Sequence, residues 1–323
     1  MYSLIVVDYN SLEKTIEYIQ LCWKFLGEKG AAHVVIVENG TPSNPLELLA
    51  DNFGETELLR SLEIEQPVYS FEKGNQQVLY CNSGANLGYA KGNNLGVIIA
   101  SKIWSDPFYI ISNNDLVFSK TLDLSVVDHI FDEKPEVGIV GPMVVTPAGE
   151  QQSPRILQSA PRRLIVNYWI SACGNLLGSN TGRKLWDKYC NDTVQNAQNG
   201  FFDWVTGCFF FVRADAFHRA GMFDNYTFLY AEEMIIAKRL ESVGSRVYFC
   251  RDVEVIHKHA ESTKKALTTF RMAEVDFDAN CYFYSRYMGV SKTKITCAKI
   301  SFALYRVLFH TKQKIKHCLR KQN

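Results

Sequence analysis

Short apolar runs, each followed by a polar cluster, constrain the fold of this chain more than any other feature of its sequence. Four of them are typical of buried strands: Leu4–Val7, Val34–Val37, Val78–Tyr80 and Phe108–Ile111. Helical patterns lie between them, at Leu12–Leu26 and from a Gly/Asn-rich loop to about Ile103. This alternation predicts an α/β fold with a Rossmann-like, mostly parallel sheet flanked by helices. Ligands bind beyond the carboxyl ends of such strands, where the polar clusters lie.

The second half of the chain is less regular before the pattern returns. Residues 149–203 mix Asn, Gln, Ser and aromatic residues, which indicates an excursion from the sheet that contacts an acceptor or a simple surface insertion. We then expect a strand at Trp204–Arg213, a helix at Glu232–Val243 and a strand at Val247–Phe249.

The overall charge of +1 conceals an asymmetry between the body of the chain and its C-terminus. Residues 290–323 hold nine Lys and Arg and no acid, so residues 1–289 carry 26 basic and 34 acidic groups, a net charge of −8. An acidic body argues against a nucleic-acid partner. Within the basic tail, Ile300, Leu304 and Val307 recur at helical spacing. The tail is therefore predicted to be a basic amphipathic helix that lies on an anionic membrane surface or packs on the catalytic domain.

Cysteine usage and the N-terminus indicate the compartment. The nine cysteines are scattered singly, without CxxC or Cys/His metal spacing, as expected for reduced thiols in a cytosolic protein. An apolar strand opens the chain without a basic secretory leader, and no run of 18 uncharged apolar residues occurs. These features predict a cytoplasmic protein.

The cluster Asn113-Asn114-Asp115 follows the predicted strand at 108–111. A carboxylate at a strand end can hold Mg²⁺ or Mn²⁺ against a diphosphate, although Asn-Asn-Asp is also ordinary turn chemistry. His257 follows another strand-like run and is either a structural histidine or a further ligand of a metal that Asp115 holds.

Two further clusters have a similar ambiguity. The loop at 86–94 would allow a phosphate or base to approach closely, with a helix N-terminus near Lys91, yet it matches neither the dinucleotide fingerprint nor a P-loop. Glu232 and Glu233 begin a predicted helix. The helix dipole alone favours acids at this position. Alternatively, one of the two carboxylates is a general base that takes the proton from an attacking hydroxyl.

The order of these clusters resembles that of the family-two glycosyltransferases with the GT-A fold, in particular their rhamnosyltransferase-like and capsule-synthesis branch. The resemblance spans about residues 3–265 and closes with Ser262. It comprises Val6–Asn10, Ile36–Gly40, Asn86–Ala90, Asn113–Asp115, Trp204–Cys208, Gly221–Asp224, Phe228–Glu233 and Val255–His257. It implies a GT-A catalytic domain over residues 1–265 and a C-terminal helical extension over residues 266–323.

The resemblance also implies roles for individual residues. Glu233, with Glu232 beside it, falls at the family's catalytic base; Asp115 and His257 fall at its metal ligands. Trp204, Thr206 and Gly207 would line the acceptor and sugar side. The donor would be bound by Asp8, Tyr9, Asn10, Glu38, Asn39, Asn86, Gly88, Tyr89, Lys91, Asn93, Asn113, Asn114 and Asp115.

Four positions depart from the family pattern. Asn113 replaces the first acid of the DxD motif, so metal binding would rest on Asp115 and His257. Glu38 replaces the usual Asp that contacts the base and ribose, and Asp8 stands where many relatives carry Asn. The usual Glu-Asp pair is Glu232-Glu233 here, which leaves open which of the two is the base.

The implied reaction is an inverting, metal-dependent transfer from a UDP- or dTDP-sugar to a polyprenyl-diphosphate-linked glycan in capsule or O-antigen synthesis. Its implied location is the inner face of the cell membrane. Two alternatives belong to other classes. A sugar-phosphate nucleotidyltransferase would require a Gly-rich basic phosphate loop after the first strand, where this chain has Asp8–Leu12. A non-catalytic glycan-binding scaffold need not retain Asp115, Glu233 and His257 together.

Overall fold

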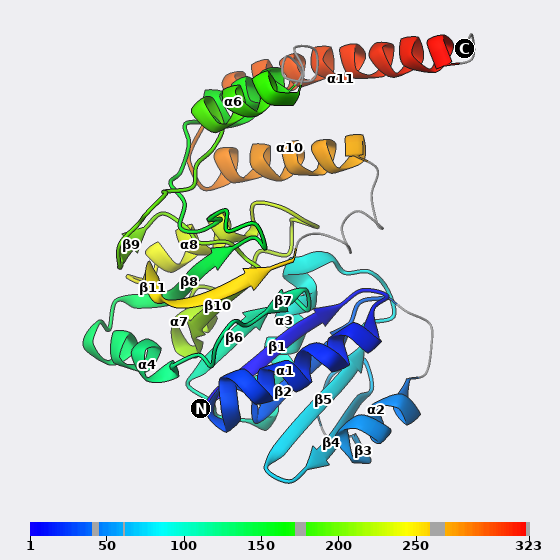
Figure 1. Cartoon of the computed structure of the whole chain (residues 1–323), viewed down its shortest axis with the longest axis vertical. Helices are drawn as coiled ribbons and strands as arrows, with labels where there is room; N and C mark the ends of the chain where they lie inside the picture. Colours follow the sequence, from blue (N-terminus) through cyan, green and yellow to red (C-terminus); the bar gives the residue numbers. More distant parts are fainter. Residues whose placement is uncertain (41–44, 61, 172–178, 259–268, 321–323) are drawn as a thin grey trace. The chain divides into compact units, whose positions relative to one another are not determined.

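The computed structural model describes residues 1–40, 45–60, 62–171, 179–258 and 269–320 (Figure 1). Ser262, which the family resemblance includes, lies outside these ranges. The chain forms two compact units. The first, here called the sheet unit, comprises residues 1–156 and 193–275, and the second, the helical unit, comprises residues 157–192 and 276–323. Segment 157–192 thus joins the C-terminal segment, and the boundary between the units after β11 falls at residue 275. The catalytic range 1–265 stays a prediction.

The sheet unit contains one mixed sheet, in which eleven strands are described, in the order β3-β4-β5-β2-β1-β6-β10-β8-β11-β7, with β9 paired to β11. The strands are β1 Tyr2–Asp8, β2 His33–Glu38, β3 Glu55–Leu59, β4 Val68–Lys73, β5 Gln76–Asn82, β6 Phe108–Ser112, β7 Leu116–Val117, β8 Val137–Val145, β9 Gly200–Phe202, β10 Phe209–Arg213 and β11 Arg246–His257.

Strand direction gathers the ends of distant segments at one edge of this sheet. β1 pairs in parallel with β2 and β6, and β8 pairs in parallel with β11. β10 runs antiparallel to both β6 and β8, so these two share a direction. The carboxyl ends of β1, β2, β6, β8 and β11 therefore point to the same edge.

Helices cover both faces of the sheet. They are α1 Leu12–Ala31, α2 Leu46–Phe53, α3 Gly88–Ile103, α4 Leu124–Glu133, α7 Ala214–Arg219 and α8 Glu232–Glu241. Leu4 and Val6 of β1 pack in the core that includes residues of α1, whereas Ile5 lies against Gly96 of α3. In Figure 1, α1 crosses in front of the sheet and α3 lies behind it. A strand buried on both faces requires an apolar residue at every position, which explains the continuous run at 4–7.

The expected elements of the first half are confirmed, with longer bounds. The strand expected at Trp204–Arg213 is wrong in its first half, because β10 begins only at Phe209. Cys208 C=O still accepts from Asn113 N–H, in register with the β6–β10 pairing, but the groups of Gly207 are used elsewhere: its N–H donates to Glu233 and its C=O accepts from the Tyr89 hydroxyl. This segment turns along the edge of the sheet instead of extending the ladder.

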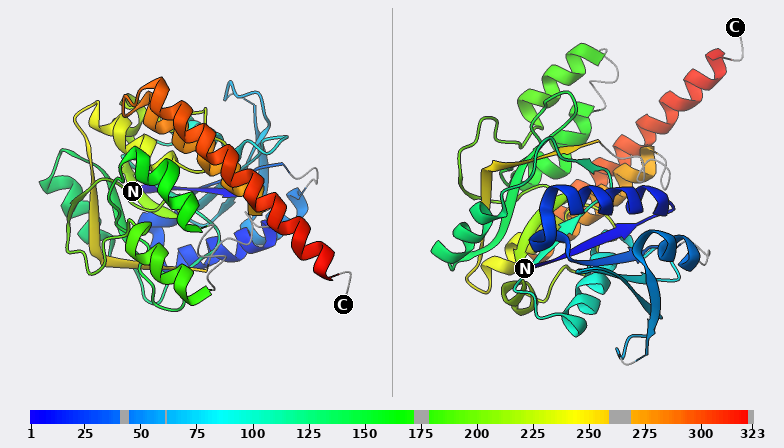
Figure 2. Two further views of the ribbon diagram at one scale, coloured as in Figure 1. Left: turned by 90° about the horizontal axis from the view of Figure 1, so that it is seen from above. Right: turned by 60° about the horizontal axis from the view of Figure 1, so that its bottom comes forward.

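The helical unit is built from the helical segment at 160–171 that contains η1 (Arg162–Val166), α6 Ser179–Tyr189, α10 Thr269–Arg286 from residue 276 onward, and α11 Lys292–Arg320 (Figure 2). Its aromatic core stacks Phe277 on Phe302 with ring centroids 4.1 Å apart, and Tyr168 meets Phe302 edge-on. Asp276 accepts hydrogen bonds from Tyr168 and Arg163. None of the helices in the described ranges is both long enough and apolar enough to cross a bilayer.

Candidate active site

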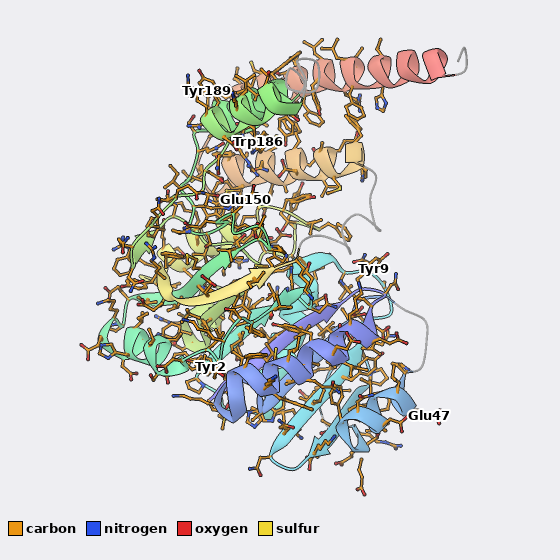
Figure 3. The ribbon with its side chains drawn as sticks, in the orientation of Figure 1. Tyr2, Tyr9, Glu47, Glu150, Trp186 and Tyr189 are labelled. Atoms are coloured by element: carbon orange, nitrogen blue, oxygen red, sulfur yellow. The ribbon has the colours of Figure 1, made fainter. Side chains whose placement is uncertain are left out.

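The candidate site lies at the edge of the sheet where the parallel strands end. Asp8 ends β1, Glu38 ends β2, Asp115 follows β6 and His257 ends β11. Tyr9, directly after β1, lies at the same end of the sheet (Figure 3). Asn10 lies in the turn after β1, Asn39 follows β2, and Asn113 and Asn114 follow β6. The other predicted residues come from the loop before α3 and its first turns, the segment before β10 and the start of α8.

Asp8 is fully buried and accepts hydrogen bonds from several side chains. Its Oδ1 accepts from Ser11 Oγ at 2.7 Å, Thr15 Oγ1 at 2.6 Å and Asn114 Nδ2 at 3.1 Å, and its Oδ2 accepts from Ser11 N–H at 3.1 Å. A buried carboxylate needs such donors to keep its charge. Asp8 and Asn114 together fix the loop that carries Asp115; their contact with a donor stays a prediction.

Asp115 and His257 approach each other across the sheet edge. His257 Nε2 lies 3.3 Å from Asp115 Oδ1, because β7 pairs His257 with Leu116, the residue after Asp115. His257 Nδ1 lies 3.0 Å from Gln152 Oε1. An amide oxygen can only accept, so the Gln152 contact suits a proton on Nδ1, and Nε2 is then the nitrogen available to a cation shared with Asp115.

This pair fits a divalent cation. A carboxylate oxygen suits Mg²⁺ or Mn²⁺, an imidazole nitrogen is a common metal ligand, and the Gln152 contact holds the imidazole in the tautomer that can coordinate. Within the described residues no group of three or more His, Cys, Asp or Glu could hold a metal. Two protein ligands suit an ion that keeps its other positions for water and phosphate oxygens.

Glu38 is buried at the end of β2 and accepts a hydrogen bond from the Tyr80 hydroxyl. Burial and then the Glu38 carboxylate raise the pKa of Tyr80 above its ordinary value, so the phenol remains a donor. Tyr80 lies on β5, the neighbour of β2. Tyr80 could not be singled out from the sequence, because the β2–β5 pairing that brings it to Glu38 was not predicted.

Asn39 holds the loop that precedes α3. Its Oδ1 accepts from Leu87 N–H at 2.8 Å, and its Nδ2 donates to Gly88 O at 3.1 Å and to Asn86 Oδ1 at 3.2 Å. Gly88 has a φ of +78°, and a Cβ there would lie 2.2 Å from Phe228 O. The loop thus requires glycine, and it is clamped between segments 39 and 228.

The start of α3 combines an exposed cation with buried polar groups. Lys91 is exposed, whereas Asn93 is buried and donates from Nδ2 to Tyr89 O at 3.0 Å. Its Oδ1 is buried and meets no hydrogen-bond partner in the part of the chain described. The Tyr89 hydroxyl donates to Gly207 O at 2.6 Å, which ties α3 to the segment before β10.

Strained backbone presents the two acids of α8. Tyr230 and Ala231 have φ of 73° and 66°, the left-handed region that side chains disfavour, and the helix begins at Glu232. Glu232 is only 4% exposed, whereas Glu233 is partly exposed. Gly207 N–H donates to Glu233 Oε1 at 3.0 Å. Of the two acids, Glu233 is thus the one that is partly exposed and bonded to the segment before β10.

Cys208 is a buried residue directly after Gly207, whose N–H meets Glu233. Burial raises the pKa of Cys208 well above its ordinary value, and the charges of Asp115 and Glu233 raise it further, while Arg155 opposes them. Both carboxylates and the Arg155 guanidinium thus act on one point. Neither Cys208 nor Arg155 was singled out as a site residue from the sequence, because their proximity arises only from the fold.

The predicted acceptor side surrounds Trp204. This side chain is 6% exposed, and the Arg155 guanidinium carbon lies 4.9 Å from its ring centroid. Thr206 N–H donates to Ser153 Oγ at 3.4 Å. The structure thus places Trp204, Thr206 and Gly207 on one continuous segment that leads to Glu233; their acceptor role stays a prediction.

Fold and site together define an α/β chain with the fold of GT-A glycosyltransferases, and the comparisons with known proteins confirm the family-two-like resemblance. Over 197 residues the chain is 25% identical to an N-acetylglucosaminyl-diphospho-decaprenol L-rhamnosyltransferase from two strains of Mycobacterium tuberculosis. The match covers 56% of this chain and 59% of the relative, so the chain spans about three fifths of that protein's length. No protein-family model matches.

A solved structure supports the fold. The crystal structure of GalNAc-T7 with UDP, GalNAc and Mn²⁺ superposes with a TM-score of 0.52 at 13% identity, covering 88% of this chain and 49% of that chain. At this identity the likeness establishes the shared fold alone.

The contact between Gly207 and Glu233 gives a stability prediction. In Gly207→Ala the new Cβ would lie 2.6 Å from Glu233 Oε1, so the carboxylate must move. Overpacking of this kind costs about 1–3 kcal/mol. We expect a loss of this size in the free energy of unfolding, measured by urea denaturation. Gly200→Ala is the matched control, since its Cβ would meet nothing closer than 4.0 Å. Equal stability of the two variants would contradict the described contact.

Proposed function

We propose that this chain is an inverting glycosyltransferase that moves a sugar from a UDP- or dTDP-sugar to a polyprenyl-diphosphate-linked glycan. The name of the mycobacterial relative supports L-rhamnose as the sugar and an N-acetylglucosaminyl-diphospho-lipid as the acceptor. Capsule or O-antigen synthesis is the proposed process. The observation that carries the proposal is that the Asp115–His257 pair and Glu233 meet the same segment. Gly207 N–H donates to Glu233, and Cys208 C=O accepts from Asn113 N–H, two residues before Asp115.

The donor would bind with its nucleoside toward Glu38 and its diphosphate toward Asp115. Glu38, held by Tyr80, would accept from the base or ribose, and Asp115 and His257 would hold Mg²⁺ or Mn²⁺. Such an ion, when bound, neutralises charge on the leaving diphosphate and acts as a Lewis acid.

Glu233 would act as the general base. The acceptor hydroxyl attacks the anomeric carbon and gives its proton to Glu233, while the bond from that carbon to the diphosphate oxygen breaks and the nucleoside diphosphate leaves. The Gly207 N–H holds the Glu233 carboxylate in place through Oε1. Glu232 is more buried than Glu233, which favours Glu233 as the base.

A donor panel tests the reaction class. Purified protein incubated with UDP-, dTDP- and GDP-sugars, and with Mn²⁺, Mg²⁺ or EDTA, should release nucleoside diphosphate from one donor only, in the presence of metal. Asp115→Ala should abolish the metal dependence together with the release, because Asp115 supplies the proposed carboxylate ligand. Release that persists unchanged in EDTA and in the variant would contradict the proposed metal role. If no donor is hydrolysed, calorimetric binding of UDP or dTDP decides, and no binding would overturn the transferase proposal.

A pair of isosteric variants tests the assignment of the base. Glu233→Gln keeps the volume and loses the proton acceptor, and general-base assistance typically contributes about 10²–10⁴-fold. We therefore expect kcat to fall by that factor in Glu233→Gln, with the KM for the donor little changed. Glu232→Gln is the matched control, and its kcat should fall far less. The reverse ranking would transfer the base to Glu232.

The structure of α11 supports the proposed membrane location. One face of the helix is buried through Ile295, Ala298, Phe302 and Tyr305. Another face exposes four aliphatic residues, each between 53% and 61% exposed: Ile300, Leu304, Val307 and Leu308. Lys299 and Arg306 border these residues in the sequence, and residues 290–323 contain no acid. An exposed apolar stripe with basic flanks fits an anionic bilayer surface at the inner face of the cell membrane.

The neighbouring segment of the helical unit supports the same location. α6 exposes Trp186 and Tyr189, each to 42%, together with Lys184 and Lys188 (Figure 3). Tyr and Trp favour the membrane–water interface, where the ring is buried and the polar tip stays wet.

Vesicle binding tests this surface. Leu304→Ser with Leu308→Ser should weaken co-sedimentation with phosphatidylglycerol-containing vesicles by at least about tenfold, because two aliphatic side chains no longer leave water. Leu48→Ser with Leu58→Ser is the matched control, since these two side chains, in the sheet unit, are each 38% exposed. The membrane proposal would be contradicted if the wild-type protein does not bind vesicles but forms dimers, and if Leu304→Ser with Leu308→Ser abolishes the dimers.

A further inference from the structure

Arg155 is fixed beside Trp204 by backbone pairing. Arg155 N–H donates to Trp204 O at 2.9 Å, and Trp204 N–H donates to Arg155 O at 3.4 Å. The guanidinium carbon lies 4.9 Å from the centroid of the Trp204 ring. Backbone and side chain therefore hold the cation in one place, on the segment that leads to Gly207.

A short chain of contacts links this cation to the proposed metal ligands. Arg155 Nε donates to the backbone oxygen of Gln152 at 2.9 Å. The side-chain oxygen of the same Gln152 lies 3.0 Å from His257 Nδ1, and His257 Nε2 lies 3.3 Å from Asp115 Oδ1. Gln152 thus orients the imidazole with its side chain and the guanidinium with its backbone.

The charge of the site makes this cation significant. Asp115, Glu232 and Glu233 are carboxylates, and a diphosphate that enters among them is itself a polyanion. Arg155 is joined to this group of carboxylates through Gln152 and His257 on one side and through Trp204, three residues before Gly207, on the other. A fixed cation there would offset the repulsion between the carboxylates and the ligand.

We propose that Arg155 binds a diphosphate group in this site. The inference rests on the proposed function and adds to it a residue outside the family motifs. Arginine suits this task because its planar guanidinium can stack on an aromatic ring with one face and donate from its edge to phosphate oxygens in pairs. Lysine keeps the charge but offers neither the stack nor the paired donors.

Calorimetric titration with free nucleotides tests the proposal without turnover. UDP and dTDP are compared with their monophosphates and nucleosides, in Mg²⁺ and in EDTA, for wild type, Arg155→Gln and Arg155→Lys. Arg246→Gln is the matched control, because Arg246 also stacks on an aromatic ring, with its guanidinium carbon 4.0 Å from the Phe201 centroid. Arg246 is exposed and begins β11, so it lies at the opposite end of that strand from His257. Thermal unfolding of each variant checks that the fold is intact.

For the preferred nucleotide we expect Arg155→Gln to weaken diphosphate binding at least about tenfold, in EDTA as well as in Mg²⁺, since hydrogen bonds to a charged group are lost. The affinity of Arg155→Gln for the nucleoside should stay unchanged. The affinity of Arg155→Lys for the diphosphate should lie between those of the wild type and Arg155→Gln, and the affinity of Arg246→Gln should equal that of the wild type. A second arm titrates a short-chain N-acetylglucosaminyl-diphospho-prenol. A loss confined to this arm would assign Arg155 to the diphosphate of the acceptor instead of the donor.

Wild-type affinity of folded Arg155→Gln for both diphosphates would overturn the inference while leaving the proposed function intact. A loss equal for nucleoside and nucleoside diphosphate would also overturn it, because Arg155 would then act only by holding the local structure. If Arg155→Gln unfolds, Arg155→Lys decides by the same comparison. A wild-type protein that binds neither nucleotide would overturn the inference and the proposed function together.

Discussion

The buried carboxylate of Asp8 is the interaction on which the candidate site depends. It ends β1 at the centre of the sheet, accepts from Ser11 and Thr15 at the start of α1, and accepts from Asn114 in the loop after β6. A carboxylate removed from water is tolerated only with such partners, so the three segments must meet at this point. Because Asn114 precedes Asp115, the same contacts set where the proposed metal ligand lies.

Further constraints act from the other side of the site. The antiparallel strand β10 starts between the ends of β6 and β8, and its preceding segment carries Gly207, whose N–H meets Glu233 and whose C=O meets Tyr89. The left-handed backbone at Tyr230 and Ala231 delivers Glu233 to that N–H. Strain of this kind costs of order 1–3 kcal/mol for each residue and persists where surrounding contacts enforce it. The site is thus preorganised by backbone groups as much as by side chains.

Much of the fold could be predicted from the sequence, because strands buried on both faces leave continuous apolar runs such as Leu4–Val7. β3 has mostly exposed residues and leaves no such run, and it was missed. The apolar stretch Trp204–Cys208 reads as strand, yet its backbone groups serve the site, so local pattern and tertiary structure conflict there. Residues 157–192 pack with the C-terminal helices, and this long-range contact could not be predicted from any local sequence pattern.

The candidate site was predicted through ordered motifs, which located Asp115, Glu233 and His257 but not their partners. Their partners reach the site only through strand pairing and backbone contacts between segments far apart in sequence; these partners are Tyr80, Gln152 and Arg155. Proximity of this kind depends on register, which one sequence does not reveal.

The most direct test of the central claim is a crystal structure with Mn²⁺ and UDP or dTDP, recorded with anomalous scattering at the manganese edge. The account predicts an anomalous peak within coordination distance of Asp115 and His257, the diphosphate on that ion and the base beside Glu38. A nucleotide bound elsewhere, or an ion that contacts neither Asp115 nor His257, would contradict it.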